Sequence, residues 1–422
     1  MAMYQDISRC RICGNEDLTK VLDLGEQFLS SSFVKSNDEV DEFSKSRVPL
    51  TLLLCGTCGL VQLRETVDRD LMYRSYFYRS GVNPMMRDAL ADVTRDIKAH
   101  SNLKEGDSVL DIGCNDGTML TYFPITMRRI GMDPAQNINR HSLDPSIIVV
   151  QDYFSADKAR GVNDGKFFKA VSSIAMFYDL DDPNAFVSEV KSVLAPEGTW
   201  CVQLSYLATT VQTMNFYDIC HEHLLYYSLR TLKFLMDRHG LKIIDASQND
   251  VNGGSLRFFA VHADDPRTVS PALLKIEEAE KGLGLAEPAT YERFNAAIQD
   301  LKRITLEFIA GERKAGGLVV GLGASTKGNV LLQYFGITKD MLPAISDRYA
   351  EKVGLRTLGT DIRVVSEEEA RDMKPSAMLV LIWFFKDELL KREREYLDNG
   401  GKLFFPMPYP HVVTKDGEER LN

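Results

Sequence analysis

The sequence has no long apolar run and no recognisable export signal at its start. The clearest apolar stretch, residues 377–385, is far shorter than the roughly 18 residues that suggest a membrane span. The opening residues, MAMYQDISRC, contain neither a basic n-region nor an apolar h-region, so we expect no signal peptide. We therefore expect a cytoplasmic protein without a membrane partner.

The sequence also has no excess of positive charge. Its 50 Lys and Arg residues face 60 Asp and Glu residues, which gives a net charge of −10. This balance argues against a nucleic-acid backbone as partner, but it leaves room for a small anion in one local pocket. With 422 residues, of which 44% are hydrophobic, the chain is typical of a globular protein of two or three domains.

Cysteine is scarce, and the odd number of seven fits a disulfide framework poorly. Four of them form two CxxC pairs, Cys10 with Cys13 and Cys55 with Cys58. Four thiolates complete a closed tetrahedral zinc site with no open position for water, which predicts a structural role for the metal. The long gap between the pairs predicts an extended loop. Buried free cysteines and a nucleic-acid-binding zinc finger are the alternatives, and the acidic charge disfavours the second.

Short apolar segments alternate with helical patterns from residue 107 onward. Strands are expected at 108–112, 129–132, 147–150, 170–174, 199–204, 241–245 and 255–262, and helices at 85–97, 118–123, 183–194 and 229–239. This alternation predicts an α/β fold with a mostly parallel sheet covered by helices on both faces. Helical connectors at 272–284 and 290–311 lead to a second, smaller α/β unit that starts at Gly317. We predict three domains, 1–78, 79–265 and 266–422.

The segment VLDIGCNDG (109–117) follows the first predicted strand of the core. Gly113 and Gly117 allow a sharp turn and a close approach to a ligand. Asn115 stands where a dinucleotide-binding motif has its second glycine, and the acidic side chains, including Asp111, would repel a pyrophosphate. The loop therefore favours S-adenosylmethionine, a sulfonium cation without phosphate, over NAD.

Further candidate cofactor ligands follow the next two strands. Asp133 lies about 20 residues after the loop, where a ribose-binding carboxylate is expected. Asp152 and Tyr153 follow the next strand and could hold the adenine. Solvated loop residues are the alternative for each of these side chains taken alone.

Several motifs together resemble a known family, the S-adenosylmethionine-dependent C-methyltransferases of nucleotide-linked deoxysugars. The motifs are the paired CxxC region, YFYRS (76–80), VLDIGCNDG, CHEHL (220–224) followed by YYSL (226–229), NGGS (252–255) and GLGASTKGN (321–329). The resemblance covers nearly the whole chain. It implies a class I methyltransferase Rossmann-like core with an N-terminal zinc-binding domain and a C-terminal Rossmann-like domain that holds the sugar nucleotide.

The CHEH segment is the candidate catalytic centre. It is not a zincin motif, because the second histidine position holds Leu225. Histidine titrates near neutral pH and can remove a proton from carbon next to a carbonyl. The resemblance implies that His223 is this base, with Glu222 beside it. Surface or capping histidines are the alternative.

Two positions depart from the family. Cys220 stands where relatives commonly have tyrosine, and Met176 where they have histidine, which puts the substrate and the methylated carbon in doubt. Cys220 is a weak acid or small packing residue. Tyr76 and Tyr78 lie between the zinc region and the core. The resemblance favours Tyr78 as a site residue and Tyr76 as a substrate contact; an aromatic contact between domains is the alternative.

A second glycine loop, GLGASTKGN (321–329), follows a strand and opens a helix. It is not a Walker A motif. Backbone amides at the helix start and the charge of Lys327 would favour an anion. Together with the resemblance, this makes the loop a candidate site for a nucleotide diphosphate, with these contacts: Gly323, Ser325, Lys327, Asn329 and Arg348. A turn used only for packing is the alternative.

The expected reaction is C-methylation of a keto-deoxysugar nucleotide by a protein that we expect to be monomeric. His223 removes a proton, and the resulting enolate carbon takes the methyl group. Other classes stay open at this point: a zinc-ribbon methyltransferase acting on RNA or a small molecule, an NAD-linked enzyme, and a nucleotide-sugar-binding protein without catalysis.

Overall fold

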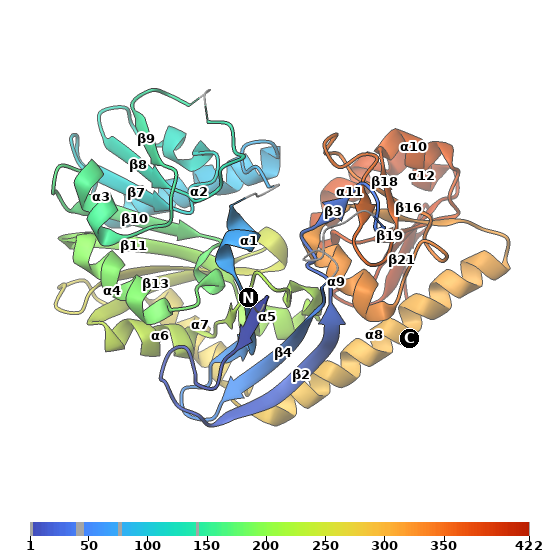
Figure 1. The fold of residues 1–422 in the computed structure, drawn as a ribbon, viewed down its shortest axis with the longest axis horizontal. Coiled ribbons are helices and arrows are strands. Elements are labelled where there is room, and N and C mark those ends of the chain that lie inside the picture. The colour runs from blue at the N-terminus through green and yellow to red at the C-terminus, as the bar shows by residue number, and fades with distance from the viewer. Residues whose placement is uncertain (1–2, 39–45, 75–77, 141–142, 422) are drawn as a thin grey trace.

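The computed structural model describes residues 3–38, 46–74, 78–140 and 143–421. Two α/β lobes lie side by side, and a smaller β-rich N-terminal region lies beneath and between them (Figure 1). The left lobe, coloured cyan to yellow-green, contains the central part of the chain, and the right lobe, orange to red, contains the C-terminal part. The domain boundaries predicted from the sequence stay a prediction, because strands of one region join sheets of another.

The central lobe contains a seven-stranded sheet in the order β13-β14-β11-β10-β7-β8-β9. Its strands are β7 Ser108–Ile112, β8 Arg128–Met132, β9 Ile147–Val150, β10 Phe168–Ile174, β11 Leu194–Ser205, β13 Leu241–Asn249 and β14 Ser255–His262. Strand β14 runs antiparallel to its neighbours β11 and β13. The five strands from β11 to β9 in this order all run parallel to one another. The predicted mostly parallel α/β sheet is confirmed.

Helices pack on both faces of this sheet, as the alternating pattern predicts (Figure 1). They are α2 Pro84–Ser101, α3 Ala156–Val162, α4 Pro183–Val193, α5 Leu207–Gln212 and α6 Leu229–Arg238. One predicted helix is wrong: the segment after the first glycine loop is a short 3₁₀ helix, η1 Thr118–Tyr122. Two more 3₁₀ turns, η2 Phe177–Asp179 and η3 Phe216–Asp218, follow β10 and α5.

The N-terminal region forms a four-stranded sheet in the order β12-β5-β4-β2. Its strands are β2 Leu18–Gln27, β4 Val48–Cys55, β5 Val61–Leu63 and β12 Leu225–Tyr226; β1 Tyr4–Asp6 pairs with β6 Glu65–Val67, and the short helix α1 Arg69–Tyr73 follows. The gap between the CxxC pairs therefore contains a long antiparallel strand pair and not only the loop that we predicted. Strand β12 comes from the central part of the chain, so the two regions share a sheet.

The C-terminal lobe contains a nine-stranded sheet in the order β22-β21-β20-β19-β15-β16-β18-β17-β3. Its strands are β15 Val319–Leu322, β16 Ala344–Ser346, β17 Arg356–Thr357, β18 Arg363–Val365, β19 Ala377–Val380, β20 Lys402–Phe405, β21 His411–Thr414, β22 Gly417–Arg420 and the N-terminal β3 Phe33–Val34. Strand β3 pairs with β17, so the N-terminal region also enters this sheet.

The helices of the C-terminal part begin with two that lead out of the central lobe. They are α7 Pro271–Lys281, α8 Pro288–Lys314, α9 Thr326–Phe335, α10 Glu367–Asp372, α11 Lys386–Arg392 and α12 Arg394–Asp398; the remaining 3₁₀ turns are η4 Val251–Gly253 and η5 Trp383–Phe385. The 27-residue α8 runs along the bottom of the right lobe (Figure 1).

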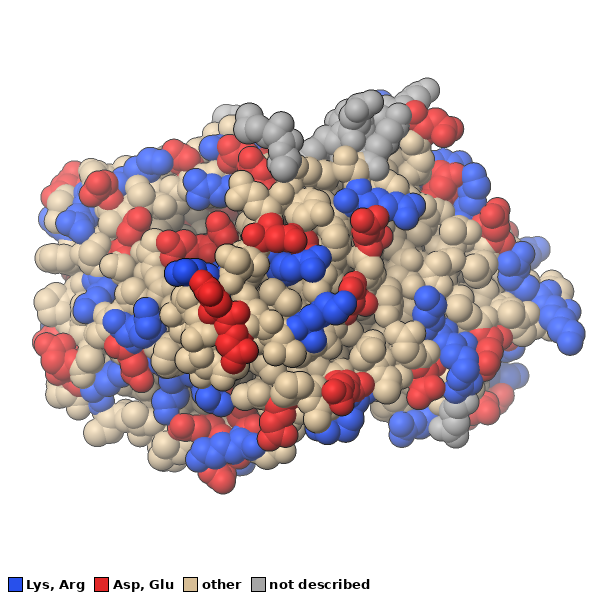
Figure 2. All heavy atoms as spheres, turned by 60° about the horizontal axis from the view of Figure 1, so that its bottom comes forward, with Lys and Arg blue, Asp and Glu red and all other residues tan. Residues whose placement is uncertain are grey.

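One cluster of buried apolar side chains connects the three regions. It includes Leu54 of the N-terminal sheet, Trp200 of the central sheet and Phe404 of the C-terminal sheet, each at most 2% exposed. None of the helices among the described residues is long and apolar enough to cross a membrane. On the face shown in Figure 2, basic and acidic side chains are interspersed and form no large basic patch.

Candidate active site

A cavity of about 1230 Å³ lies where the three regions meet. It brings together residues that the sequence places far apart and that we predicted as site residues. They are Tyr78, Asp111, Gly113, Asn115, Asp133, Tyr153, Cys220, Glu222, His223, Gly323, Ser325, Lys327 and Arg348. Both glycine loops and the CHEH segment therefore face one common space.

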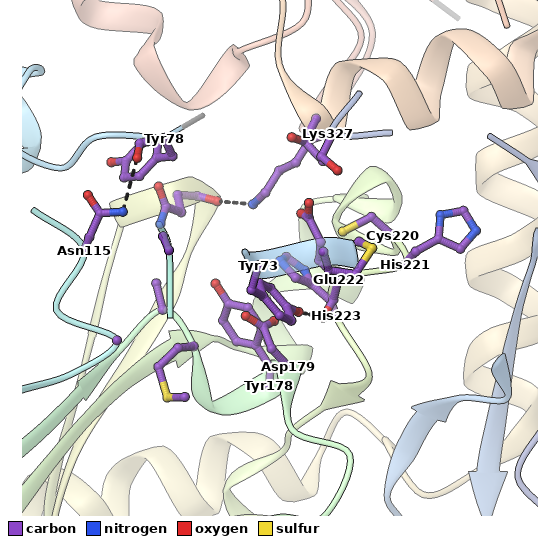
Figure 3. A pocket seen from close by; sticks show the side chains of 18 of the residues that line it. Tyr73, Tyr78, Asn115, Tyr178, Asp179, Cys220, His221, Glu222, His223 and Lys327 are labelled. Atoms are coloured by element: carbon purple, nitrogen blue, oxygen red, sulfur yellow. Dashed lines mark hydrogen bonds between the residues drawn. The ribbon is translucent and has the colours of Figure 1, made fainter. Parts of the chain in front are cut away.

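The first glycine loop follows β7 and lines the part of the cavity formed by the central sheet. Gly113 has φ of +76°, and a Cβ there would come within 3.0 Å of the Met176 side chain. Asn115 adopts φ of +53°, a left-handed conformation that asparagine tolerates better than most residues. The Asn115 side chain accepts from the Ser80 N–H at 3.0 Å and donates to the Tyr78 carbonyl at 3.2 Å (Figure 3). These bonds hold the 78–80 segment against the loop.

Two buried carboxyl groups lie beside this loop at the ends of β7 and β8. Burial raises the pKa of Asp111 to about 7, against a hydrogen bond from Ser172 at 2.8 Å that lowers it. Burial also raises the pKa of Asp133, although its carboxylate accepts from the Asn115 N–H at 2.9 Å and pairs with Arg140 at 2.8 Å. A cation near Asp111 would favour its ionised form, which fits a sulfonium ligand.

Three of the predicted site residues that the structure describes do not line the cavity, namely Gly117, Asp152 and Asn329. Tyr76 lies outside the described residues. Gly117 forms part of the turn, Asp152 pairs with Lys158 at 2.6 Å, and the Asn329 side chain donates to the Ser30 carbonyl at 2.7 Å. Asn329 therefore holds the N-terminal segment against the C-terminal lobe.

Aromatic and basic side chains form the wall beyond β9. The Tyr153 ring lies under the Arg69 guanidinium, 4.2 Å from the ring centroid, and Arg74 is also close, at 4.9 Å. This arrangement connects helix α1 of the N-terminal region with the segment after β9, where we predicted the adenine contact.

His223 is oriented so that one ring nitrogen is free for proton transfer. Its Nδ1 is 2.8 Å from the Asp218 carbonyl oxygen, which can only accept, so Nδ1 carries the proton and Nε2 the lone pair. The Tyr178 ring packs against the imidazole, with 4.3 Å between centroids. Burial lowers the pKa of His223, and Lys327 lowers it further, against the raising effect of Asp218. The imidazole is therefore neutral at neutral pH and able to accept a proton.

Asp218 is a functional candidate that the sequence did not single out. Its carboxylate lies 2.5 Å from Lys327 Nζ and 3.5 Å from His223 Nδ1. Burial acts to raise the pKa of Asp218, but the charges of Lys327 and His223 bring it below its ordinary value. Asp218 thus joins the second glycine loop to the candidate base. The only signal in the sequence was its position five residues before His223.

Lys327 extends from the second glycine loop toward this centre (Figure 3). Besides Asp218, it contacts the Asn252 carbonyl oxygen at 3.1 Å. The loop is shaped by Ser325, which caps α9 by accepting from the Gly328 N–H at 3.0 Å. Arg348 lies at the cavity edge, where it pairs with Glu367 and Glu388.

Three polar groups surround His223 in addition to Asp218. Ligand atoms of Cys220, Glu222 and His223 all lie within 4.8 Å of one another. Burial raises the pKa of Glu222 to about 7, and the Glu222 Oε1 has no hydrogen-bond partner among the described residues. Asp179, which the sequence analysis did not select, also faces the cavity from turn η2.

The four N-terminal cysteines form a compact cluster whose thiol groups fit a tetrahedral metal ion. The ligand atoms lie within 4.8 Å of one another, with Sγ–Sγ distances of 3.6 Å for Cys10–Cys58 and 3.5 Å for Cys13–Cys55. Four thiolates at this spacing suit zinc and leave no position for a substrate. The cluster has a structural role.

The four-stranded N-terminal sheet also holds the CHEH segment, which contains His223. Strand β12, which begins two residues after His223, pairs with β5, and Leu63 N–H donates to the Leu224 carbonyl at 2.8 Å. The His221 ring bonds the Val48 carbonyl at 2.9 Å, and the Tyr73 hydroxyl donates to the Glu222 carbonyl at 2.9 Å. His221 is thereby a structural residue, and the N-terminal region fixes the backbone on both sides of His223.

Comparison with known proteins agrees with this arrangement. Three family models match successive parts of the chain: a zinc binding domain at residues 10–73, a methyltransferase domain at 85–246 and a C-methyltransferase C-terminal domain at 250–408. The C-methyltransferase NovU of Streptomyces niveus is 29% identical over 416 residues, which cover 98% of this chain and 99% of NovU.

Together, the three models and NovU match a C-methyltransferase over nearly the whole chain.

Two solved methyltransferases each match less than half of this chain. The plantazolicin methyltransferase BpumL, solved with S-adenosylhomocysteine, is 14% identical, with a TM-score of 0.34; the match covers 43% of this chain and 86% of BpumL. A methyltransferase from Clostridium acetobutylicum gives 11% identity, a TM-score of 0.33 and coverage of 42% and 92%. The cofactors of the C-methyltransferase are S-adenosylmethionine and structural zinc, the latter at the four cysteines.

Proposed function

We propose that this C-methyltransferase acts on a nucleotide-linked keto-deoxysugar and that His223 removes the proton from the carbon to be methylated. One observation supports this proposal above all. The cofactor loop, the free nitrogen of His223 and the second glycine loop line the same cavity. Pockets for one small ligand usually measure about 300–1,000 Å³, so a cavity of about 1230 Å³ suits two ligands bound together.

The chemistry of His223 fits removal of a proton from carbon next to a ketone. Its neutral ring presents Nε2, while Nδ1 is engaged with the backbone of Asp218. When Nε2 takes the proton, the C–H electron pair forms a carbon–carbon double bond and the carbonyl oxygen gains negative charge. The adjacent Asp218 carboxylate stabilises the imidazolium that results.

S-adenosylmethionine, when bound, supplies the electrophilic methyl group that the enolate carbon accepts. The residues that would hold it are Asp111, Gly113, Asn115, Asp133 and Tyr153, all in the cavity wall. The protein's main contributions are the relative orientation of two ligands and the exclusion of water from the buried base.

The second glycine loop supports a sugar nucleotide as the second ligand. Amide groups at the start of helix α9 favour an anion, and Lys327 adds a positive charge on the cavity side. We propose that the diphosphate lies against Gly323, Ser325 and Lys327, with the sugar directed toward His223. The cytoplasmic location and the monomeric state remain predictions.

The test is a search for product with purified protein. Wild-type protein is incubated with S-adenosylmethionine and a panel of 4-keto-deoxysugar nucleotides, and mass spectrometry follows the gain of one methylene group. We expect one class of keto-sugar nucleotide to gain this mass, and no gain with His223→Ala, which still binds S-adenosylhomocysteine. Full activity of that variant would contradict the base assignment.

Controls separate the proposal from its alternatives. A nucleotide-sugar-binding protein without catalysis would bind the panel and yield no methylated product. An RNA methyltransferase would retain RNA on a filter and transfer label to it. Either result, together with no methylated sugar, would overturn the proposed substrate class.

A further inference from the structure

The turn that follows β10 forms the cavity wall beside the candidate base. Turn η2 is anchored by the buried Phe177 ring, which packs at 5.4 Å from Trp200 and 5.2 Å from Tyr227. The Leu224 N–H donates to the Tyr178 carbonyl at 2.9 Å, and the Tyr178 ring lies against His223. The turn is thus fixed relative to the base from two sides, and its last residue, Asp179, lies in the same group of side chains (Figure 3).

Asp179 presents an unsatisfied carboxyl group to this cavity. Its Oδ1 is shielded from solvent and has no hydrogen-bond partner among the described residues. The neighbouring Glu222 is 6% exposed, and its Oε1 is likewise shielded from solvent and without a hydrogen-bond partner among the described residues. Buried polar groups in native proteins are nearly always hydrogen-bonded, so an exception at a cavity wall points to a polar group of the ligand as the missing partner.

The charged groups around the cavity put Asp179 and Asp218 in different protonation states. Burial raises the pKa of Asp179 well above its ordinary value, and the negative charges of Glu222 and Asp218 raise it further. Asp218, by contrast, is kept ionised by the positive charge of Lys327. Asp179 is therefore a neutral carboxylic acid at neutral pH, able to donate an O–H, whereas Asp218 can only accept.

We propose that Asp179 is a catalytic residue that donates a hydrogen bond to the carbonyl oxygen of the substrate and stabilises the oxyanion formed when His223 removes the proton. This inference rests on the proposed function. The C–H pair becomes the new double bond, the carbonyl π pair moves to oxygen, and the Asp179 proton is shared with that oxygen. When the carbon–carbon bond forms, the carbonyl is restored and the proton stays with Asp179.

Three other polar groups near His223 are already engaged or are weak donors. The Tyr73 hydroxyl donates to the Glu222 carbonyl, and Lys327 is held by Asp218 and the Asn252 carbonyl. Cys220 offers a thiol, which is a poor hydrogen-bond donor. Asp179 differs from these three groups because its Oδ1 has no hydrogen-bond partner among the described residues. Glu222 shares this property, but its pKa is raised only to about 7, whereas that of Asp179 is raised well above its ordinary value.

Proton exchange isolates the step in which Asp179 would act. The protein is incubated in D₂O with the keto-sugar nucleotide that wild type methylates and with S-adenosylhomocysteine, so that no methyl group is available. Mass spectrometry then measures deuterium entering the carbon next to the carbonyl. Wild type should exchange, and His223→Ala should not.

The expected effects of the Asp179 variants differ by their ability to donate. Asp179→Ala should slow both exchange and kcat by about 100- to 1000-fold, the range for loss of one oxyanion donor, with KM changed by less than about threefold. Asp179→Asn keeps the size and one N–H donor, so it should lose only about tenfold. Asp300→Asn is the control; this carboxylate lies on helix α8 outside the cavity wall, is 74% exposed, and should leave both rates unchanged.

The outcomes separate this inference from the proposed function. If wild type neither methylates nor exchanges any keto-sugar nucleotide, the proposed function fails. If wild type exchanges and Asp179→Ala or Asp179→Asn exchanges as fast, the role of Asp179 is refuted. A loss expressed in KM alone would also refute it, because it would indicate recognition of the substrate without stabilisation of the oxyanion. Binding of S-adenosylhomocysteine verifies that each variant is folded.

Discussion

Replacing Asp218 by asparagine tests how the candidate base is tuned. The substitution removes a negative charge 3.5 Å from His223 Nδ1, but it preserves the backbone carbonyl that accepts the Nδ1 proton at 2.8 Å. The tautomer of the ring should therefore stay the same. The positive charge of Lys327 is left near the ring without its partner. Both effects disfavour the imidazolium, so the pKa of His223 should fall further below its ordinary value.

The size of the shift follows from Coulomb's law. At 3.5 Å the attraction is about 1 kcal/mol with the dielectric constant of water and about 5 kcal/mol at an effective value of 20, which brackets a partly buried pair. This range corresponds to a decrease of roughly 1 to 3.5 pKa units. Because the base acts in its neutral form, the acid limb of the kcat profile should move to lower pH by the same amount.

The assay is an NMR titration of the histidine ring protons in the protein without substrate. The His223 signal is assigned by its loss in His223→Gln. A second variant, Asp218→Asn combined with Lys327→Met, also removes the repelling ammonium, and the pKa of His223 should then rise relative to the single Asp218 variant. A fall in the pKa of His223 on Asp218→Asn, followed by a rise on adding Lys327→Met, would not result from a general loosening of the fold.

A midpoint for His223 that is unchanged in Asp218→Asn would refute the reasoning. It would mean that the carboxylate charge does not reach the ring, and that burial alone sets the pKa. Stability is followed in parallel, because removing one partner of a buried ion pair costs about 3–5 kcal/mol and should lower the melting temperature.

Four further outcomes are expected. Cys13→Ser should lower the zinc content below one ion per chain and reduce the melting temperature, as measured by metal analysis and calorimetry. Cys220→Ser should keep one zinc per chain; a loss of metal would show that the group formed by Cys220, Glu222 and His223 binds it. Affinity for S-adenosylmethionine should rise as pH increases through about 7, where Asp111 ionises, and calorimetry should show that Asp111→Asn removes this dependence. Tyr73→Phe loses one hydrogen bond, worth about 1 kcal/mol, and should lower activity by misplacing the 222–223 backbone; an unchanged kcat would contradict that link.

Elements governed by local pattern were predicted well. The strand at 108–112, the glycine loop after it and the helix at 229–238 follow from apolar periodicity and from glycine or capping residues within a few positions. The helix expected at 118–123 was wrong because Gly117 and the turn leave only a short 3₁₀ segment before Phe123. The four-cysteine cluster was also predictable, since metal geometry restricts ligand spacing.

Pairings between distant segments were not predictable in this way. Strand β3 has two residues and no apolar pattern of its own, yet it completes the C-terminal sheet. Strand β12 is equally short and joins the zinc-binding sheet. Edge strands of this length are stabilised by hydrogen bonds to a partner that only the tertiary structure supplies.

The sequence by itself determined the α/β class and the four metal ligands, because each depends on residue types at short spacing. The choice of His223 came from the resemblance of its segment to the family, and it stays a proposal together with the cofactor loop. Only the tertiary structure revealed that Asp218 and Lys327 meet beside His223 and that Asp179 faces the same cavity. It also revealed that Asn329 binds the N-terminal segment and does not line the cavity. These contacts join residues that lie far apart in the sequence. Their proximity and their burial arise only when the three regions pack together, so no local pattern could predict them.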